Sequence, residues 1–151
     1  MARQLKTANN YFDDVMVGDF FRTGEHVVTE SDIQRFCELS GDYSPQHVSE
    51  EAAIKLGFGG RIAHGCLILS LGTGLVFDLD GTMDKVVAFY GMDRVRFTKP
   101  VRIGDAIHME AEIIELIDKG GTCRIQTHRS LEIPWRSNFG HFTDIWKHTG
   151  R

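Results

Sequence analysis

The sequence has few cysteines, and their arrangement argues against a fold built on disulfides. Only three of the 151 residues are cysteine, and no two of them form a Cys-x-x-Cys pair. An odd number of cysteines without this spacing is typical of reduced thiols in the cytosol. The N-terminus also lacks the apolar segment of a secretory signal. We therefore expect a cytoplasmic protein.

Prolines are equally few, and no linker or internal repeat divides the chain. There are three prolines, no low-complexity tract and no repeat at a fixed period. Hydrophobic residues make up 42% of the sequence and charged residues 25%, the usual balance of a globular domain. A chain of this length buries enough surface to fold without disulfides or metals. We expect one domain over residues 1–151.

Long apolar runs and an excess of positive charge are also absent. The longest apolar stretch, Cys66 to Phe77, contains small and polar residues and is followed by Asp78. It is shorter than the ~20 residues that a membrane span needs. With 17 basic and 21 acidic residues the net charge is -4, and no block of like charge stands out. We expect no membrane span and no nucleic-acid partner.

Strand and helix signals alternate in the first part of the chain. Residues 20–28 contain pairs of phenylalanine and valine and predict a first strand. Ser31 and Gln34 have the spacing of a capping box, and the apolar periodicity that follows ends at Gly41, so we expect a short amphipathic helix. Ser49 can cap a second helix, which Gly57 ends.

A third helix is predicted over Gly65 to Phe77. Its residues are apolar on nearly all sides, which is typical of a helix surrounded by protein. Gly72 and Gly74 each cost about 1 kcal/mol in a helix relative to alanine. We therefore expect a close neighbour against that face.

The rest of the chain is strand-like. Alternating apolar residues predict strands near residues 86–90, 95–97 and 107–113, and a further strand over 122–132. Gly104-Asp105 and Lys119-Gly120-Gly121 are hairpin turn signals between strands. Pro134, in the unusual segment 133–140, argues against a central strand there. Helices early and antiparallel strands late predict an α+β fold with a helix on one face of a sheet.

The most informative stretch brings an acid and a base close together. Asp42 and His47 lie five residues apart. Pro45 fixes its own φ and keeps Ser44 out of the helical region, so we expect Asp42 and His47 on a non-helical backbone where their side chains converge. A carboxylate and an imidazole within reach of one water can take a proton from it and deliver one to a neighbouring carbon. This pair favours hydration and dehydration chemistry.

A second candidate element follows at the start of the predicted third helix. The amide of Gly65 is one of the unsatisfied donors at the positive end of that helix, which suits a developing oxyanion. We expect His64 to have a structural task, such as bonding a backbone carbonyl, and Cys66 to be a buried small hydrophobe. His47 and Cys66 lack a further ligand at a recognisable spacing, so no metal site is expected.

These residues resemble the MaoC-like dehydratases, which include the R-specific enoyl-CoA hydratases. The resemblance is carried by Phe36, Ser40-Gly41-Asp42, Pro45, His47 and Ala63-His64-Gly65, and continues more weakly through residues 97–101 and 104–105. It implies a single hot-dog domain, in which an antiparallel sheet wraps around a long central helix. It also implies a homodimer or higher homo-oligomer with the active site at the subunit interface.

The resemblance also implies a reaction and roles for its residues. The reaction is reversible hydration of trans-2-enoyl-CoA to (R)-3-hydroxyacyl-CoA. The catalytic aspartate and histidine of the family map onto Asp42 and His47, and its oxyanion glycine onto Gly65. No metal or redox cofactor is implied, and coenzyme A enters only as part of the acyl-CoA substrate.

Three further residues are predicted to bind substrate. Ser44 stands where the family usually has asparagine and has only a hydroxyl to orient the water or the acid. Thr73 aligns with a small hydroxyl residue that often lines the site on the central helix. Lys99 is one of several basic residues that can meet the phosphates of coenzyme A.

Two other functions stay open at this point. A hot-dog thioesterase would hydrolyse acyl-CoA and use the same helix N-terminus for its carbonyl. A catalytically silent acyl-CoA-binding subunit would keep the pocket and lose the chemistry. The intact pair of Asp42 and His47 favours the hydratase, whereas Ser44 gives some weight to the silent binder.

Overall fold

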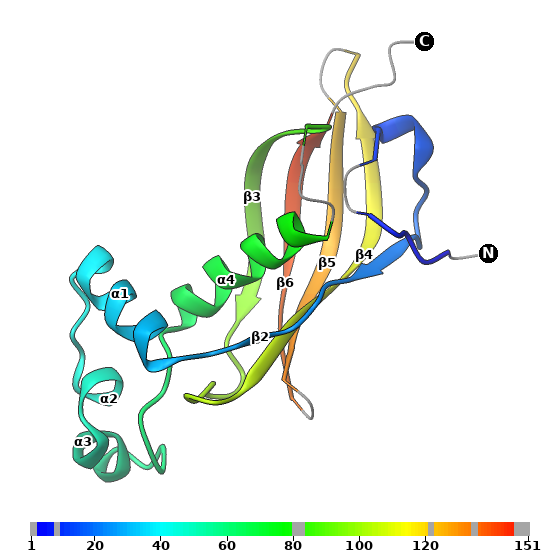
Figure 1. The fold of residues 1–151 in the computed structure, drawn as a ribbon. Helices are drawn as coiled ribbons and strands as arrows, with labels where there is room; N and C mark the ends of the chain where they lie inside the picture. The colour runs from blue at the N-terminus through cyan, green and yellow to red at the C-terminus, as the bar shows by residue number, and fades with distance from the viewer. Residues whose placement is uncertain (1–2, 8–9, 80–83, 121–122, 134–135, 147–151) are drawn as a thin grey trace.

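The computed structural model describes residues 3–7, 10–79, 84–120, 123–133 and 136–146. Figure 1 shows helix α4 lying across one face of a curved sheet, with three shorter helices gathered near the end where α4 begins. This arrangement confirms the predicted α+β fold. The described elements in chain order are η1 (Phe12–Asp14), β1 (Phe20–Arg22), β2 (His26–Val27), α1 (Glu30–Ser40), α2 (Pro45–Val48), α3 (Glu50–Lys55), α4 (Gly65–Asp78), β3 (Val86–Arg96), β4 (Ala106–Asp118), β5 (Cys123–Ile133) and β6 (Arg136–Trp146).

The sheet is antiparallel, and its strand order brings the path between β3 and β4 past the start of α4. The strands follow the order β1-β4-β5-β6-β3, with β2 also paired to β4. Because β3 lies at one edge and β4 near the other, the segment between them must cross the fold. On the way, Arg102 pairs with Ile62, and the Ala63 amide donates to the Val101 carbonyl at 2.8 Å. These contacts place residues 97–101 beside the N-terminus of α4.

The main core lies between α4 and the sheet. Buried residues of α4, among them Leu67 and Ile68, belong to the same apolar cluster as buried residues of β4. The alternation predicted for β4 is confirmed, because Ile107, Met109 and Ala111 are all buried there. Apolar burial of this kind is the dominant favourable contribution to folding.

The prediction that α4 is surrounded by protein is wrong for the single chain. Cys66, Thr73 and Gly74 are exposed on one side of the helix, and Phe77 is 49% exposed. Cys66 is therefore not the buried hydrophobe that was expected. A β-carbon added at Gly74 would meet no atom within 4 Å. The expected neighbour of this face is not part of the same chain's described residues.

The strand predicted over residues 20–28 is divided into β1 and β2. The Thr23 amide donates to the Met109 carbonyl at 2.9 Å, but the Met109 amide donates to the Thr23 side-chain hydroxyl instead of to a main-chain carbonyl. A side chain that replaces a ladder acceptor interrupts regular pairing. The chain therefore leaves the ladder at residues 23–25 before β2 begins.

The first helix starts two residues earlier than the predicted capping box requires. Thr29 is the N-cap, its hydroxyl accepts from the Asp32 amide, and the Asp32 carboxylate accepts from the Thr29 amide. The box thus uses Thr29 and Asp32 rather than Ser31 and Gln34. The predicted end is confirmed, because Gly41 follows the helix with φ of 75°.

Two predictions about turns and strands in the second half need correction. Gly104-Asp105 is not a hairpin between neighbouring strands, because β3 and β4 are not paired with each other; instead these residues bond to Val28. Residues 136–146 form β6, an interior strand between β5 and β3, which the sequence analysis did not predict. Pro134 itself lies outside the described residues, between the paired ends of β5 and β6. The turn at residues 119–120 does connect β4 to β5 as predicted.

Candidate active site

Asp42 lies on the loop that follows α1, and Ser44 determines the environment of its carboxylate. Both the amide and the hydroxyl of Ser44 donate to Asp42 Oδ1, at 3.0 Å and 2.5 Å. The hydroxyl bond is the largest reason why the pKa of Asp42 lies below its ordinary value, and the amide bond is the second. Hydrogen bonds to the charged form favour ionisation. The carboxylate is exposed and ionised near neutral pH.

His47 lies on the one-turn helix α2, so the expected non-helical backbone is wrong at this residue. Pro45 occupies the first position of α2, where a missing N–H costs nothing. The His47 side chain is buried, and its Nδ1 lies 2.7 Å from the Ile62 carbonyl oxygen. Because a carbonyl can only accept, Nδ1 carries the proton and Nε2 keeps a lone pair. Nε2 is therefore the atom of His47 that can accept a proton.

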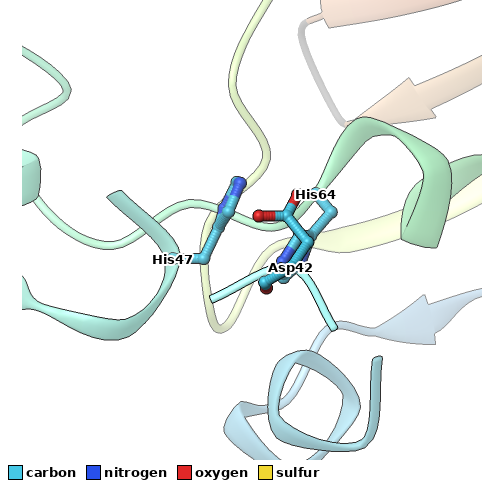
Figure 2. Close-up of side chains that lie close together, drawn as sticks. All are labelled: Asp42, His47 and His64. Atoms are coloured by element: carbon cyan, nitrogen blue, oxygen red, sulfur yellow. Dashed lines mark hydrogen bonds between the residues drawn. The ribbon is translucent and has the colours of Figure 1, made fainter. Parts of the chain in front are cut away.

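His64 brings its ring against both of these residues. It is the N-cap residue of α4, and its buried ring stacks on that of His47 with centroids 3.7 Å apart. Its Nε2 lies 3.0 Å from the backbone carbonyl oxygen of Asp42, which confirms the predicted bond to a carbonyl. A carboxylate oxygen of Asp42, a ring nitrogen of His47 and a ring nitrogen of His64 all lie within 4.8 Å of one another. Figure 2 shows the three side chains together.

A cavity of about 340 Å³ opens beside this cluster, at the start of α4. His47 and Gly65 line it together with Lys99, so the structure brings these three predicted residues to one place. The remainder of the wall is mostly apolar. It is formed by Phe58, Ile62, Ala63, Ile68, Phe97, Thr98, Pro100 and Val101. An apolar cavity with a few convergent polar groups is typical of a small-molecule site.

A second cavity, of about 190 Å³, shares His47 with the first. Its other walls come from α1, from Tyr43 and Val48, and from Arg61. The Arg61 guanidinium is held by Glu30, with Nη2 and Oε1 2.9 Å apart. His47 therefore lines both cavities.

Thr73 is the predicted site residue that the structure does not bring to this cluster. It lies on the exposed side of α4, and its hydroxyl donates to the Ser70 carbonyl at 2.7 Å. Thr73 is not among the described residues that line either of the two cavities. Its role in substrate binding stays a prediction that would require a contact from outside the single chain.

Some features of the site could not be found from the sequence. Phe58 belongs to no motif and enters the site only because the chain turns back between α3 and α4. The ring stack of His47 on His64 was also missed, since two histidines separated by seventeen residues give no periodic signal. The structure does not pair His47 with Cys66 as possible metal ligands. The side chains that cluster with His47 are those of Asp42 and His64, and Cys66 is not among them.

Comparison with known proteins shows the family to which this chain belongs. The sequence profile of the MaoC like domain matches residues 16–132. The chain belongs to the MaoC-like dehydratase family. It is 35% identical over 116 residues to the 3-hydroxybutyryl-CoA dehydratase of Methylorubrum extorquens, covering 76% of this chain and 71% of the relative. It is 34% identical over 109 residues to the (R)-specific enoyl-CoA hydratase of Rhodospirillum rubrum, covering 72% of each.

Another MaoC relative is much longer than this chain. The protein MaoC of Klebsiella aerogenes is 38% identical over 99 residues, and the match spans 66% of this chain but 29% of that protein. This family member therefore corresponds to only part of the Klebsiella protein.

Solved structures of the family show the same architecture. A monoamine oxidase regulatory protein from Archaeoglobus fulgidus has a TM-score of 0.86 and 30% identity, covering 99% of both chains. An (R)-hydratase from Pseudomonas aeruginosa has a TM-score of 0.75 and 25% identity, covering 93% of this chain and 86% of that one. The MaoC-like chain thus has the hot-dog fold, as the resemblance implied, and it is a hydro-lyase of the hydratase and dehydratase type. None of the helices in its described residues is long and apolar enough to span a membrane.

Proposed function

We propose that this MaoC-like protein catalyses reversible hydration of trans-2-enoyl-CoA to (R)-3-hydroxyacyl-CoA. The observation that carries the proposal is the short distance between the acid and the base: a carboxylate oxygen of Asp42 and a ring nitrogen of His47 lie within 4.8 Å of each other. His47 and Gly65, the first residue of α4, also line one cavity. An acid–base pair beside a fixed amide donor is what addition of water to a conjugated thioester requires.

The protonation states of the pair assign its roles. His47 Nε2 accepts one proton from the water while the water oxygen forms its bond to C3 of the enoyl group. The ionised Asp42 accepts a hydrogen bond from the second hydrogen of that water and fixes its orientation. The electron pair of the double bond moves onto the thioester, and His47 then returns its proton to C2. One water is consumed, and both new bonds form on the same face because a single group carries the proton.

Gly65 supplies the electrophilic contact in this proposal. Its amide belongs to the first residue of α4, so it has no intrahelical acceptor and lies at the positive end of the helix dipole. A thioester oxygen that gains negative charge during addition is stabilised there. Loss of a comparable donor costs about 2.7–4 kcal/mol of transition-state stabilisation in other enzymes. We propose no metal or redox cofactor for these steps, since water, an acid–base pair and the amide account for every atom transferred.

We also propose that the active protein is a homodimer. The first part of the edge strand β3 exposes several apolar side chains, with Val87 at 59%, Tyr90 at 56% and Met92 at 41%. One large apolar side chain of α4, Phe77, is also exposed, at 49%. Exposed apolar surface on an edge strand favours pairing with another chain. A second copy paired along β3 would cover this surface and bring a neighbour to α4.

The test is loss of the conjugated enoyl-thioester absorbance when the purified protein is mixed with crotonyl-CoA. We expect the wild type to consume the substrate and Asp42→Asn to lose turnover with its fold intact. Asp14→Asn, an exposed aspartate on η1, is the matched control and should keep full activity. Release of free thiol from a saturated acyl-CoA would support the thioesterase instead. Tight acyl-CoA binding without turnover on short, long or branched enoyl-CoAs would support the silent binder.

A further inference from the structure

His64 contacts both members of the proposed catalytic pair through different parts of one side chain. Its ring face stacks on the His47 ring, with centroids 3.7 Å apart and an interplanar angle of 26°. Its Nε2 donates to the backbone carbonyl of Asp42 at 3.0 Å. Asp42 and His47 belong to different elements, the loop after α1 and the helix α2. Among the interactions described above, His64 is the bridge between these two elements at the site.

The position of His64 is itself fixed from several sides. The ring is 3% exposed, the Phe36 ring lies 4.9 Å away, and Cys37 Sγ lies 3.8 Å from Nε2. Gly65, the proposed oxyanion donor, is the next residue in the chain. A displacement of His64 would therefore move the acid, the base and the start of α4 relative to one another.

A role in packing alone does not account for an imidazole at this position. Because Nε2 donates to Asp42, Nδ1 keeps a lone pair, and this buried atom has no hydrogen-bond partner among the described residues. Burying an unpaired polar atom is costly, and a phenyl ring would fill the same space without that cost. The side chain also makes no capping bond to α4, so it does not serve the helix end. The contacts to Asp42 and His47 are what the imidazole supplies.

We propose that His64 is a positioning residue for this reaction: its ring sets the orientation of His47, and its N–H holds the Asp42 loop. The inference rests on the proposed hydratase function and adds a residue to its machinery. Misplacement of a reacting group by 1 Å can cost about 10²-fold in rate. We therefore expect His64 to affect the rate of turnover and not the affinity for substrate.

Two substitutions separate the two contacts. His64→Phe keeps a ring against His47 and loses the donor to Asp42, whereas His64→Gln keeps an N–H donor and loses the ring. His108→Phe is the matched control, because His108 is also buried and lines neither cavity, and its Nε2 makes no hydrogen bond among the described residues although the Glu110 carboxylate lies 3.5 Å away. We expect both His64 variants to lose about 10²-fold in kcat on crotonyl-CoA. We expect KM to stay within about threefold, because ground-state binding is retained.

Structural readouts make the test independent of turnover. Hydrogen exchange at residues 41–44 should accelerate in His64→Phe and stay slow in His64→Gln. The ring proton resonances of His47 should lose their stacking shift in His64→Gln and keep one in His64→Phe. Unchanged exchange and unchanged His47 resonances in both variants would overturn the positioning role even if the wild type were inactive. A loss of kcat that only follows a lower unfolding temperature, and that His108→Phe shares, would also overturn it. Failure of the proposed function would show separately, as absence of turnover in the wild type.

Discussion

The ring of Phe97 lies directly over Gly65, the first residue of α4. A β-carbon at position 65 would fall 2.9 Å from two carbons of this ring, closer than real side chains approach one another. The absence of a side chain therefore lets Phe97 close one wall of the cavity that His47 lines. Glycine at this point serves both the amide donor and the shape of the site.

Gly65→Ala should consequently damage the site through Phe97. The added methyl group forces the Phe97 ring aside, and because this ring is 48% exposed and free to move, the free energy of unfolding should fall by no more than about 1 kcal/mol, the low end of the overpacking range. The shift also changes the cavity wall, so we expect a fall in kcat/KM on crotonyl-CoA. Chemical denaturation and the absorbance assay measure the two effects. Gly24→Ala, where an added β-carbon meets nothing within 4 Å, is the control that should leave both values unchanged. Wild-type activity in Gly65→Ala would remove the steric argument.

Ser44 controls the ionisation of Asp42, and this gives a pH dependence of known sign. The Ser44 hydroxyl is the largest cause of the lowered pKa of Asp42, so Ser44→Ala should raise that pKa toward its ordinary value. Because the ionised carboxylate is the active form, the acid limb of the kcat/KM profile should move to higher pH. Asparagine, the usual family residue, offers an N–H donor in the same place. Ser44→Asn should therefore keep the acid limb of the profile near its wild-type pH. If neither substitution moved the acid limb, Ser44 would not control the ionisation of Asp42.

The sequence identified the residues that the structure brings together better than it identified the walls of the cavity. Asp42, His47 and Gly65 stand in a short motif, and local backbone rules apply to them directly. Phe58 reaches the cavity through long-range folding, which no local pattern reports. The strand β6 was missed because Pro134 suggested an irregular segment, whereas the structure ends β5 at Ile133 and begins β6 at Arg136. The sequence analysis wrongly predicted that α4 is buried on all sides. The hydrophobicity of a helix indicates that it can be buried, but it does not say whether residues of the same chain bury it.

The start of α1 offers a direct test between a sequence pattern and a structural cap. Ser31 fits the pattern by spacing, but Thr29 makes the hydrogen bond to the Asp32 amide. Thr29→Ala should lower the free energy of unfolding by about 1 kcal/mol, the usual loss for an N-cap. Ser31→Ala should change it by less than about 0.5 kcal/mol, as is typical of surface substitutions. Urea unfolding of the two variants checks this, and equal losses would contradict the assignment of the cap.

The proposed dimer predicts that charge on β3 separates the subunits. Val87 is 59% exposed on this edge strand, and Val27 on β2 is exposed to a similar extent, at 53%. Val87→Lys places a charge against an apolar partner surface and should convert the protein to a monomer with reduced activity. Val27→Lys should leave the mass and the activity unchanged. Light scattering coupled to size-exclusion chromatography measures the mass, and a monomeric wild type would refute the dimer.

Lys99 tests how the cavity meets coenzyme A. It lines the same hollow as His47 and Gly65, and we predict that its ammonium group contacts a phosphate of the carrier. Lys99→Ala should raise KM for crotonyl-CoA about fivefold, the effect of losing an exposed ion pair of about 1 kcal/mol. The rise in KM caused by Lys99→Ala should become smaller as the salt concentration increases, because salt already screens the attraction between the ammonium group and the phosphate in the wild type. It should also vanish with the crotonyl thioester of N-acetylcysteamine, which has no phosphate. Lys55→Ala, on the surface of α3 and paired with Glu51, is the control. An equal rise in KM for both thioesters would show that Lys99 shapes the acyl pocket and does not bind the phosphates.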